Sequence, residues 1–128
     1  MGASYRLVNL TRRERVEVSC FGVDKAREIV GSHAVSAVAL WYMLSCRGDQ
    51  IAFLSDYDSE AGRTAFGRSL SAAEIDAFTD ATESAIELAV SAGVLVDKGW
   101  QELANDRSIR VRHIEVNHRP GRLPSERL

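Results

Sequence analysis

The apolar segment from Ala34 to Leu44 constrains the fold of this chain more than any other feature. At helical periodicity it is apolar nearly all round, which is typical of a helix that is buried on most sides. Ser32 precedes it as a candidate N-cap and Gly48 follows it as a terminator, so we expect a helix over residues 33–46. Other layers of secondary structure must then cover this helix.

Four segments have the length and residue pattern of β-strands. Residues 5–9 and 15–20 form an alternating apolar and polar pair joined by a polar turn, and residues 50–55 are a short apolar run after Gly48. Residues 108–116 alternate too, but the apolar phase changes within this segment. A bulge near His113 would reconcile the two phases.

A second long helix is predicted over residues 71–92. Ser71 and Glu74 have the spacing of a capping box, and Gly93 is the expected terminator. The expected buried stripe of this helix consists of Ile75, Phe78, Thr82, Ile86, Ala89 and Val90.

These elements predict an α+β fold in a single domain over residues 1–117. We expect a small, mostly antiparallel sheet of about four strands, packed against the two main helices and exposed on one face. Residues 118–128 contain both prolines and are expected to be a loose C-terminal tail.

The composition favours a cytoplasmic protein. No apolar run reaches the length of about 20 residues that spans a membrane, and no basic and apolar leader marks a secreted chain. Cys20 and Cys46 stand among apolar neighbours, which favours buried free thiols over a disulfide or a metal site.

The charge of the chain is unevenly distributed along it. The total is −2, but residues 49–97 carry ten acidic and two basic side chains, a net charge of −8. The flanking segments 1–48 and 98–128 carry +3 each. Because the basic residues form no single block, this distribution argues against nucleic acid and favours a basic protein as partner.

Asp56 and Asp58 follow the apolar run at 50–55 and raise the question of a metal site. The spacing matches a calcium loop at Glu60 but fails at the glycine and at the last acidic ligand. An Asp-x-Asp after a strand is similar to the pattern of haloacid-dehalogenase-like phosphatases, although the further lysine and acidic pair of that family are not evident. A small metal-dependent phosphate-handling enzyme centred on Asp56 and Asp58 is therefore kept as an alternative function.

No other catalytic signature is found. The chain has no nucleophile elbow, no glycine-rich phosphate loop and no metal-like pair of histidines or cysteines. We therefore expect no cofactor and no catalytic residue, and a protein that is not an enzyme is favoured.

An acidic surface is the strongest functional candidate. Four carboxylates recur at helical spacing within residues 71–92, and no lysine or arginine occurs between Arg68 and Lys98 to offset them. Together with the loop they form the predicted protein-binding site, which comprises Asp56, Asp58, Glu60, Asp76, Asp80, Glu83 and Glu87. A solvated helix face without a partner is the alternative interpretation.

The N-terminal segment Tyr5-Arg-Leu-Val-Asn-Leu-Thr-Arg-Arg-Glu14 resembles the opening of a group of small, poorly characterised bacterial proteins. Their pattern is Tyr-x-Leu-Val-Asn-x-Thr-Lys-x-Glu-Tyr, followed later by Gly-Asp-x-Ile, a short apolar strand and an acidic loop. Gly48-Asp49-Gln-Ile51 matches the second part, and Phe78-Thr-Asp80 is similar to a later aromatic-x-Asp segment. Arg15 stands where the group has an aromatic residue.

By analogy, the resemblance implies an accessory or immunity-type binding protein of a bacterial toxin system. The leading expectation is thus a non-enzymatic protein-binding module with an acidic surface. The metal-dependent enzyme is one alternative, and a homo-oligomeric structural protein without a ligand is another.

Overall fold

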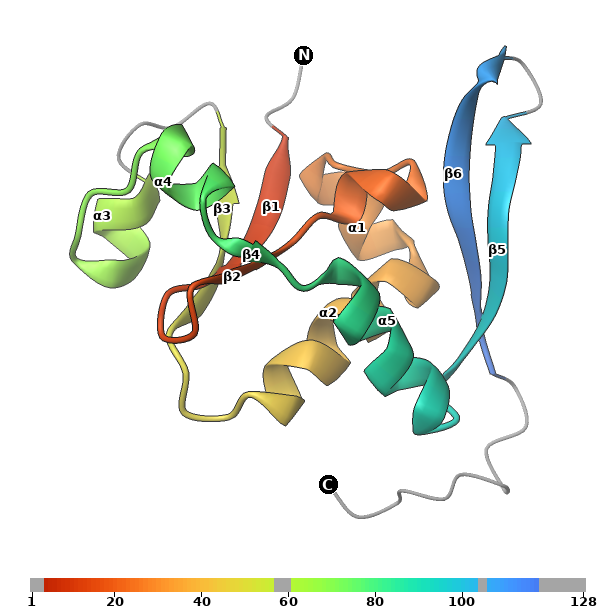
Figure 1. Ribbon diagram of the computed structural model, residues 1–128, viewed down its shortest axis with the longest axis horizontal. Coiled ribbons are helices and arrows are strands. Elements are labelled where there is room, and N and C mark those ends of the chain that lie inside the picture. The colour runs from red at the N-terminus through yellow and green to blue at the C-terminus, as the bar shows by residue number, and fades with distance from the viewer. Residues whose placement is uncertain (1–3, 57–60, 104–105, 118–128) are drawn as a thin grey trace.

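The computed structural model describes residues 4–56, 61–103 and 106–117. Figure 1 shows an α+β single domain whose elements lie in layers. Helices α1, α2 and α5 stand between a four-stranded sheet and a separate β-hairpin, while α3 and α4 lie on the far side of the sheet. The expected α+β class is confirmed. The predicted tail at 118–128 lies outside the described residues.

The sheet has the strand order β3-β1-β2-β4, in which β1 pairs antiparallel with β2 and β3 and the short β4 runs parallel to β2. The hairpin is formed by β5 and β6. The bounds of the strands are β1 Tyr5–Asn9, β2 Glu14–Val16, β3 Ile51–Ser55, β4 Thr79–Asp80, β5 Leu95–Leu103 and β6 Asp106–Val116.

The helices follow the capping signals of the sequence in part. Ser32 caps α2 by accepting the N–H of Val35, and Ser71 and Glu74 form the predicted capping box of α4. Two of the helices, α2 and α5, have more than six residues. The bounds of the helical elements are the 3₁₀ helix η1 Val18–Phe21, α1 Ala26–Gly31, α2 His33–Ser45, α3 Ala61–Phe66, α4 Ala72–Asp76 and α5 Thr82–Ser91.

The core consists of two clusters, one on each face of the sheet. Leu7 packs toward α2 and α5 in the larger cluster, whereas its neighbour Val8 packs in a smaller cluster with Leu54, Leu70 and Ile75. Consecutive strand residues point to opposite faces, so two adjacent apolar residues that are both buried require two covered faces. The expectation of one exposed sheet face was therefore wrong.

The prediction of one continuous helix over residues 71–92 was also wrong. The structure ends α4 at Asp76, inserts β4 at Thr79–Asp80 and begins α5 at Thr82. Strand β2 causes this break, because the N–H of Thr79 donates to Arg13 O at 3.0 Å and that of Ala81 donates to Arg15 O at 2.8 Å. These bonds hold the segment in an extended conformation although it contains no glycine or proline.

Two of the predicted strands differ from the structure. The second strand ends at Val16, and η1 follows it and is capped by Gly22. Gly22 has a φ of +82°, and a Cβ added there would lie 3.2 Å from Val111 Cγ1. The last strand begins at Asp106 and pairs with β5, which was not predicted, instead of joining the sheet. The predicted bulge is present beside His113, but the extra residue is on β5, where Gly99 has a φ of +81°.

Helix α2 is less buried than its composition predicts. Val35, Val38, Ala39 and Tyr42 form its buried face, but two leucines one turn apart, Leu40 and Leu44, are 59% and 46% exposed. Among the described residues, no helix is both long enough and apolar enough to cross a membrane.

Candidate functional site

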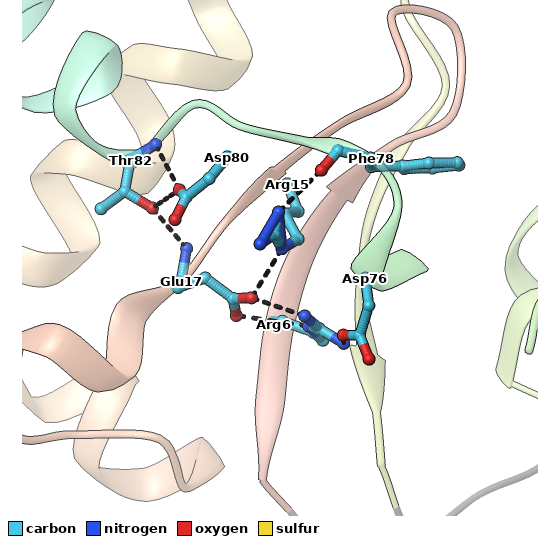
Figure 2. A network of polar contacts seen from close by, with 7 residues as sticks. All are labelled: Arg6, Arg15, Glu17, Asp76, Phe78, Asp80 and Thr82. Atoms are coloured by element: carbon cyan, nitrogen blue, oxygen red, sulfur yellow. Dashed lines mark hydrogen bonds and ion pairs between the residues drawn. The ribbon is translucent and has the colours of Figure 1, made fainter. Parts of the chain in front are cut away.

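The most concentrated group of charged side chains lies on the sheet face that carries the smaller core cluster. Arg6 donates to Glu17 at 2.5 Å and forms an ion pair with Asp76 at 2.9 Å, and Arg15 donates to the same Glu17 at 2.9 Å and to the carbonyl of Phe78 at 2.7 Å. Figure 2 shows these residues converging from β1, from β2 and the residue after it, from the end of α4 and from the segment that follows α4. We call Arg6, Arg15, Glu17, Asp76 and Asp80 the Arg6 cluster.

Strand register brings the two arginines together. Arg6 and Val8 are two residues apart in β1 and therefore point to the same face. Arg15 is the cross-strand partner of Val8, so it shares that face. Arg6 is only 21% exposed. Its partly buried charge is satisfied by carboxylates, as burial of a charge requires.

Asp80 joins the Arg6 cluster to the start of α5. Its Oδ1 accepts the backbone N–H of Thr82 at 3.0 Å and the Thr82 hydroxyl at 2.5 Å, while Thr82 Oγ1 accepts the N–H of Glu17 at 2.8 Å. Burial raises the pKa of Asp80, but the hydrogen bonds from Thr82 outweigh it and hold the pKa below the ordinary value of 3.8. Asp80 is thus ionised and binds the first residue of α5 from the position before the N-cap.

Two hollows flank Arg6. One, of about 230 Å³, has mostly polar and charged residues in its lining, among them Glu17, Asp24 and Asp56, and we call it the polar hollow. The other, of about 110 Å³, is mostly apolar and is lined by Leu54, Leu70 and Ile75 among others. Arg6 and Asp56 belong to both linings, so the two hollows share a charged wall.

The carboxylates of the polar hollow are neutralised to different degrees. Asp24 accepts the Ser4 hydroxyl at 2.8 Å and pairs with Lys25 at 3.3 Å. These contacts lower its pKa, the bond from Ser4 having the largest effect. Asp56 accepts only the backbone N–H of Ser4, at 2.9 Å, among the described contacts. Asp56 is therefore the carboxylate at this site for which the described residues supply no cation.

A second group of charged side chains is centred on Arg112. Arg112 on β6 donates to both oxygens of Glu83 at 2.7 and 2.6 Å and to Asp97 at 2.6 and 3.0 Å, and it stacks over Trp100 with 5.6 Å to the ring centroid. These bonds lower the pKa of Asp97. The group, which we call the Arg112 cluster, fastens the hairpin to α5.

The predicted acidic surface is thus divided into two parts. Asp76 and Asp80 belong to the Arg6 cluster and Asp56 lies beside it, whereas Glu83 belongs to the Arg112 cluster and Glu87 lines the same groove. The four helical carboxylates do not share one helix face, because the chain turns between α4 and α5. No cation is nearby in the sequence, as expected, but the fold brings Arg6 to Asp76 and Arg112 to Glu83. Asp58 and Glu60 lie outside the described residues.

Some of the residues that carry the resemblance, namely Asn9, Arg12, Glu14 and Asp49, come together at the opposite end of β1. The Asn9 side chain is fully buried, donates to Asp49 at 2.9 Å and to the Tyr42 hydroxyl at 3.2 Å, and accepts the N–H of Arg12 at 3.1 Å. Tyr42 donates to Glu14 at 2.7 Å. This partly buried network joins β1, the turn after it, β2, α2 and the loop before β3, and it therefore stabilises the fold.

Neither cysteine has the environment of a reactive thiol. Both are free, and burial raises the pKa of Cys20 to about 11 and also raises that of Cys46. In the part of the chain that the structure describes, no group of three or more histidine, cysteine, aspartate or glutamate side chains could hold a metal ion. The Asp56 carboxylate therefore has no described ligand partners for a cation.

Sequence reasoning missed both arginines that organise these groups. Arg6 and Arg112 are distant in sequence from the carboxylates they bind, so local spacing could not connect them. Two weak signals were present: Arg6 shares a strand face with the buried Val8, and Arg112 lies within an alternating strand. Searches of family models, of curated proteins and of solved structures found no match to this chain.

Proposed function

We propose that this chain is a non-enzymatic protein-binding module that receives a basic protein partner on the surface beside Arg6. The observation that carries the proposal is the charge around Arg6, where five carboxylates face three cations. Glu17, Asp24, Asp56, Asp76 and Asp80 outnumber Arg6, Arg15 and Lys25, which leaves a net charge of −2. Such an excess attracts a basic surface and accelerates its encounter.

The Arg112 cluster is less suited to this role. Glu83 there is committed to a bidentate ion pair with Arg112, which is itself only 12% exposed. A partner there would meet a carboxylate whose charge Arg112 already neutralises. Asp56 has no such cation among the described residues, and we therefore place the partner at the Arg6 side.

The resemblance to small bacterial proteins extends the proposal to an immunity-type or accessory role in a toxin system. A toxin encoded next to this chain would be the first partner to test. If the proposal is right, such a toxin has a basic surface that complements the acidic surface beside Arg6.

Capture from cells of the source organism tests the proposal. The full chain and its Asp56→Lys variant are used as baits at low salt, with Glu102→Lys, an exposed position on β5, as the matched charge reversal. We expect a basic polypeptide that wild type and Glu102→Lys retain and Asp56→Lys loses. Equal retention by all three baits would contradict the proposed surface.

A further inference from the structure

The apolar hollow beside Arg6 has the size and the charged rim of a docking point for one side chain of a partner. Its floor consists of Leu54, Leu70 and Ile75, each buried to at least nine-tenths, and Ala72 at the start of α4 borders it. A cavity of 150 Å³ can hold benzene, so about 110 Å³ suits a branched aliphatic side chain.

The rim of the hollow is charged in an asymmetric way. Arg6 already binds Glu17 and Asp76, whereas Asp56 on the same wall has no described cation. An aliphatic side chain in the hollow would place its chain neighbours next to Asp56 and next to the polar hollow, where Glu17 and Asp24 also lie. Charge complementarity then favours a basic neighbour.

From this arrangement we infer that the two hollows form a two-point docking site for a polypeptide segment in which an aliphatic residue lies next to an arginine or lysine. The aliphatic side chain enters the apolar hollow and excludes water from it. The basic side chain pairs with Asp56 across the rim. The inference rests on the proposed function and names the chemistry of its partner.

An apolar hollow next to an acidic rim explains how a surface with a small net charge selects a partner. Exposed ion pairs contribute little affinity by themselves, because water and salt screen them. An apolar anchor supplies the affinity, and the adjacent charge decides which segment is accepted. A basic protein without an aliphatic residue beside its positive charge should therefore bind poorly.

Short peptides serve as probes, since the partner itself is unidentified. N-acetyl-Leu-Arg-amide, N-acetyl-Leu-Gln-amide and N-acetyl-Gly-Arg-amide are titrated into the isotope-labelled full chain, and the backbone amide signals are followed by NMR. We expect the first peptide to shift the signals of Leu54, Asp56, Leu70 and Ile75, with an affinity about two- to fivefold above that of the Leu-Gln peptide.

Two matched variants separate the hollow from its surroundings. Ala72→Phe fills the hollow and should weaken binding of the Leu-Arg peptide by about tenfold. Ala73→Phe adds the same side chain at the neighbouring exposed position, which does not line the hollow, and should leave binding unchanged. Urea unfolding of both variants checks that each remains folded.

The inference is overturned if no peptide shifts these signals at about 20 mM, a concentration well above a weak millimolar Kd. Equal binding of the Gly-Arg and Leu-Arg peptides would overturn it too, and so would unchanged binding to Ala72→Phe. Failure of the inference can be told apart from failure of the proposed function. A basic partner that is captured by Ala72→Phe but not by Asp56→Lys would refute the docking site and retain the acidic surface.

Discussion

Arg6 connects three parts of this molecule, because it bonds to carboxylates at the ends of two other elements. Glu17 comes after β2 and Asp76 ends α4, so both segments are tied to the central strand β1. Glu17 in turn is shared with Arg15. A partly buried network of this kind depends on all of its members.

Replacing Arg6 tests that dependence. Arg6→Met keeps the length of the side chain but leaves Asp76 without its partner and Glu17 with one arginine instead of two. We expect the free energy of unfolding to fall by about 1–2 kcal/mol, measured by urea denaturation at pH 7. Arg68→Gln is the control, because it removes an exposed pair with Glu74 and should cost about 0.5 kcal/mol or less. Equal effects would contradict a network centred on Arg6.

Asp97 makes stability depend on pH in a defined direction. The hydrogen bonds from Arg112 hold its pKa below the ordinary value of 3.8, so the ionised form stabilises the fold above about pH 4. That contribution disappears as the pH falls through the lower pKa of the folded protein. Asp97→Asn should therefore be less stable than wild type at pH 7, with a difference that shrinks below pH 4. A difference that stays constant in urea titrations between pH 7 and pH 3 would contradict this account.

At the scale of elements, the break between α4 and α5 decides where the acidic residues lie. Asp80 stabilises the start of α5 as an N-cap does, and Thr79 and Ala81 bond to the turn and strand of β2. A single helix over this segment would have placed four carboxylates on one face. The break instead sends two of them to Arg6 and one to Arg112.

Asp80→Ala removes the cap without adding bulk. We expect a loss of about 1 kcal/mol in the free energy of unfolding, because the N–H and the hydroxyl of Thr82 lose their acceptor. Glu87→Ala, on the exposed surface of α5, should change stability by less than about 0.5 kcal/mol. Guanidinium unfolding followed by circular dichroism distinguishes the two. An Asp80→Ala protein as stable as Glu87→Ala would show that the cap is dispensable.

Some elements were predictable because local signals and tertiary packing agree there. The strands at 5–9 and 50–55, the cap at Ser32 and the capping box at Ser71 all follow from nearby residues. The break at Thr79 was not predictable in this way, because its cause is a bond to Arg13, more than sixty residues earlier. Even so, Asp80 and Thr82 are residue types that favour the start of a helix, and this signal within the predicted helix was overlooked.

The candidate site was only partly predictable for the same reason. The carboxylates of Asp56, Asp76 and Asp80 can be read from their density in the sequence, and each is present near Arg6. The positions of Arg6 and Arg112 beside these carboxylates cannot be predicted from local sequence, because strand pairing brings the arginines there. Strand β5 was not predicted, because the bulge at Gly99 interrupts its alternation of apolar and polar residues.

At the scale of the whole molecule, the hairpin is a separate layer that the helices join to the sheet (Figure 1). The Arg112 cluster supplies its polar attachment to α5, and Ile114 supplies an apolar one in the larger core cluster. Because the hairpin has only two strands, it depends on this attachment for its stability.

Arg112→Gln should therefore loosen the hairpin more than the sheet. We expect amide hydrogen exchange to accelerate in β5 and β6 while protection in β1 and β3 stays close to that of wild type. Arg110→Gln, which changes an exposed arginine two residues away, provides the control and should preserve the exchange pattern. Uniform acceleration across the sheet and the hairpin would indicate global destabilisation instead.

The central claim is that the surface beside Arg6 binds a basic protein through Asp56. The most direct measurement is the affinity of the captured partner for wild type and Asp56→Asn by calorimetry, at about 50 and 300 mM salt, either side of the ionic strength at which exposed charges are largely screened. We predict that wild type binds more weakly at high salt and that the variant binds more weakly than wild type at low salt, with a smaller salt dependence. An affinity that changes neither with salt nor with the substitution would contradict the claim.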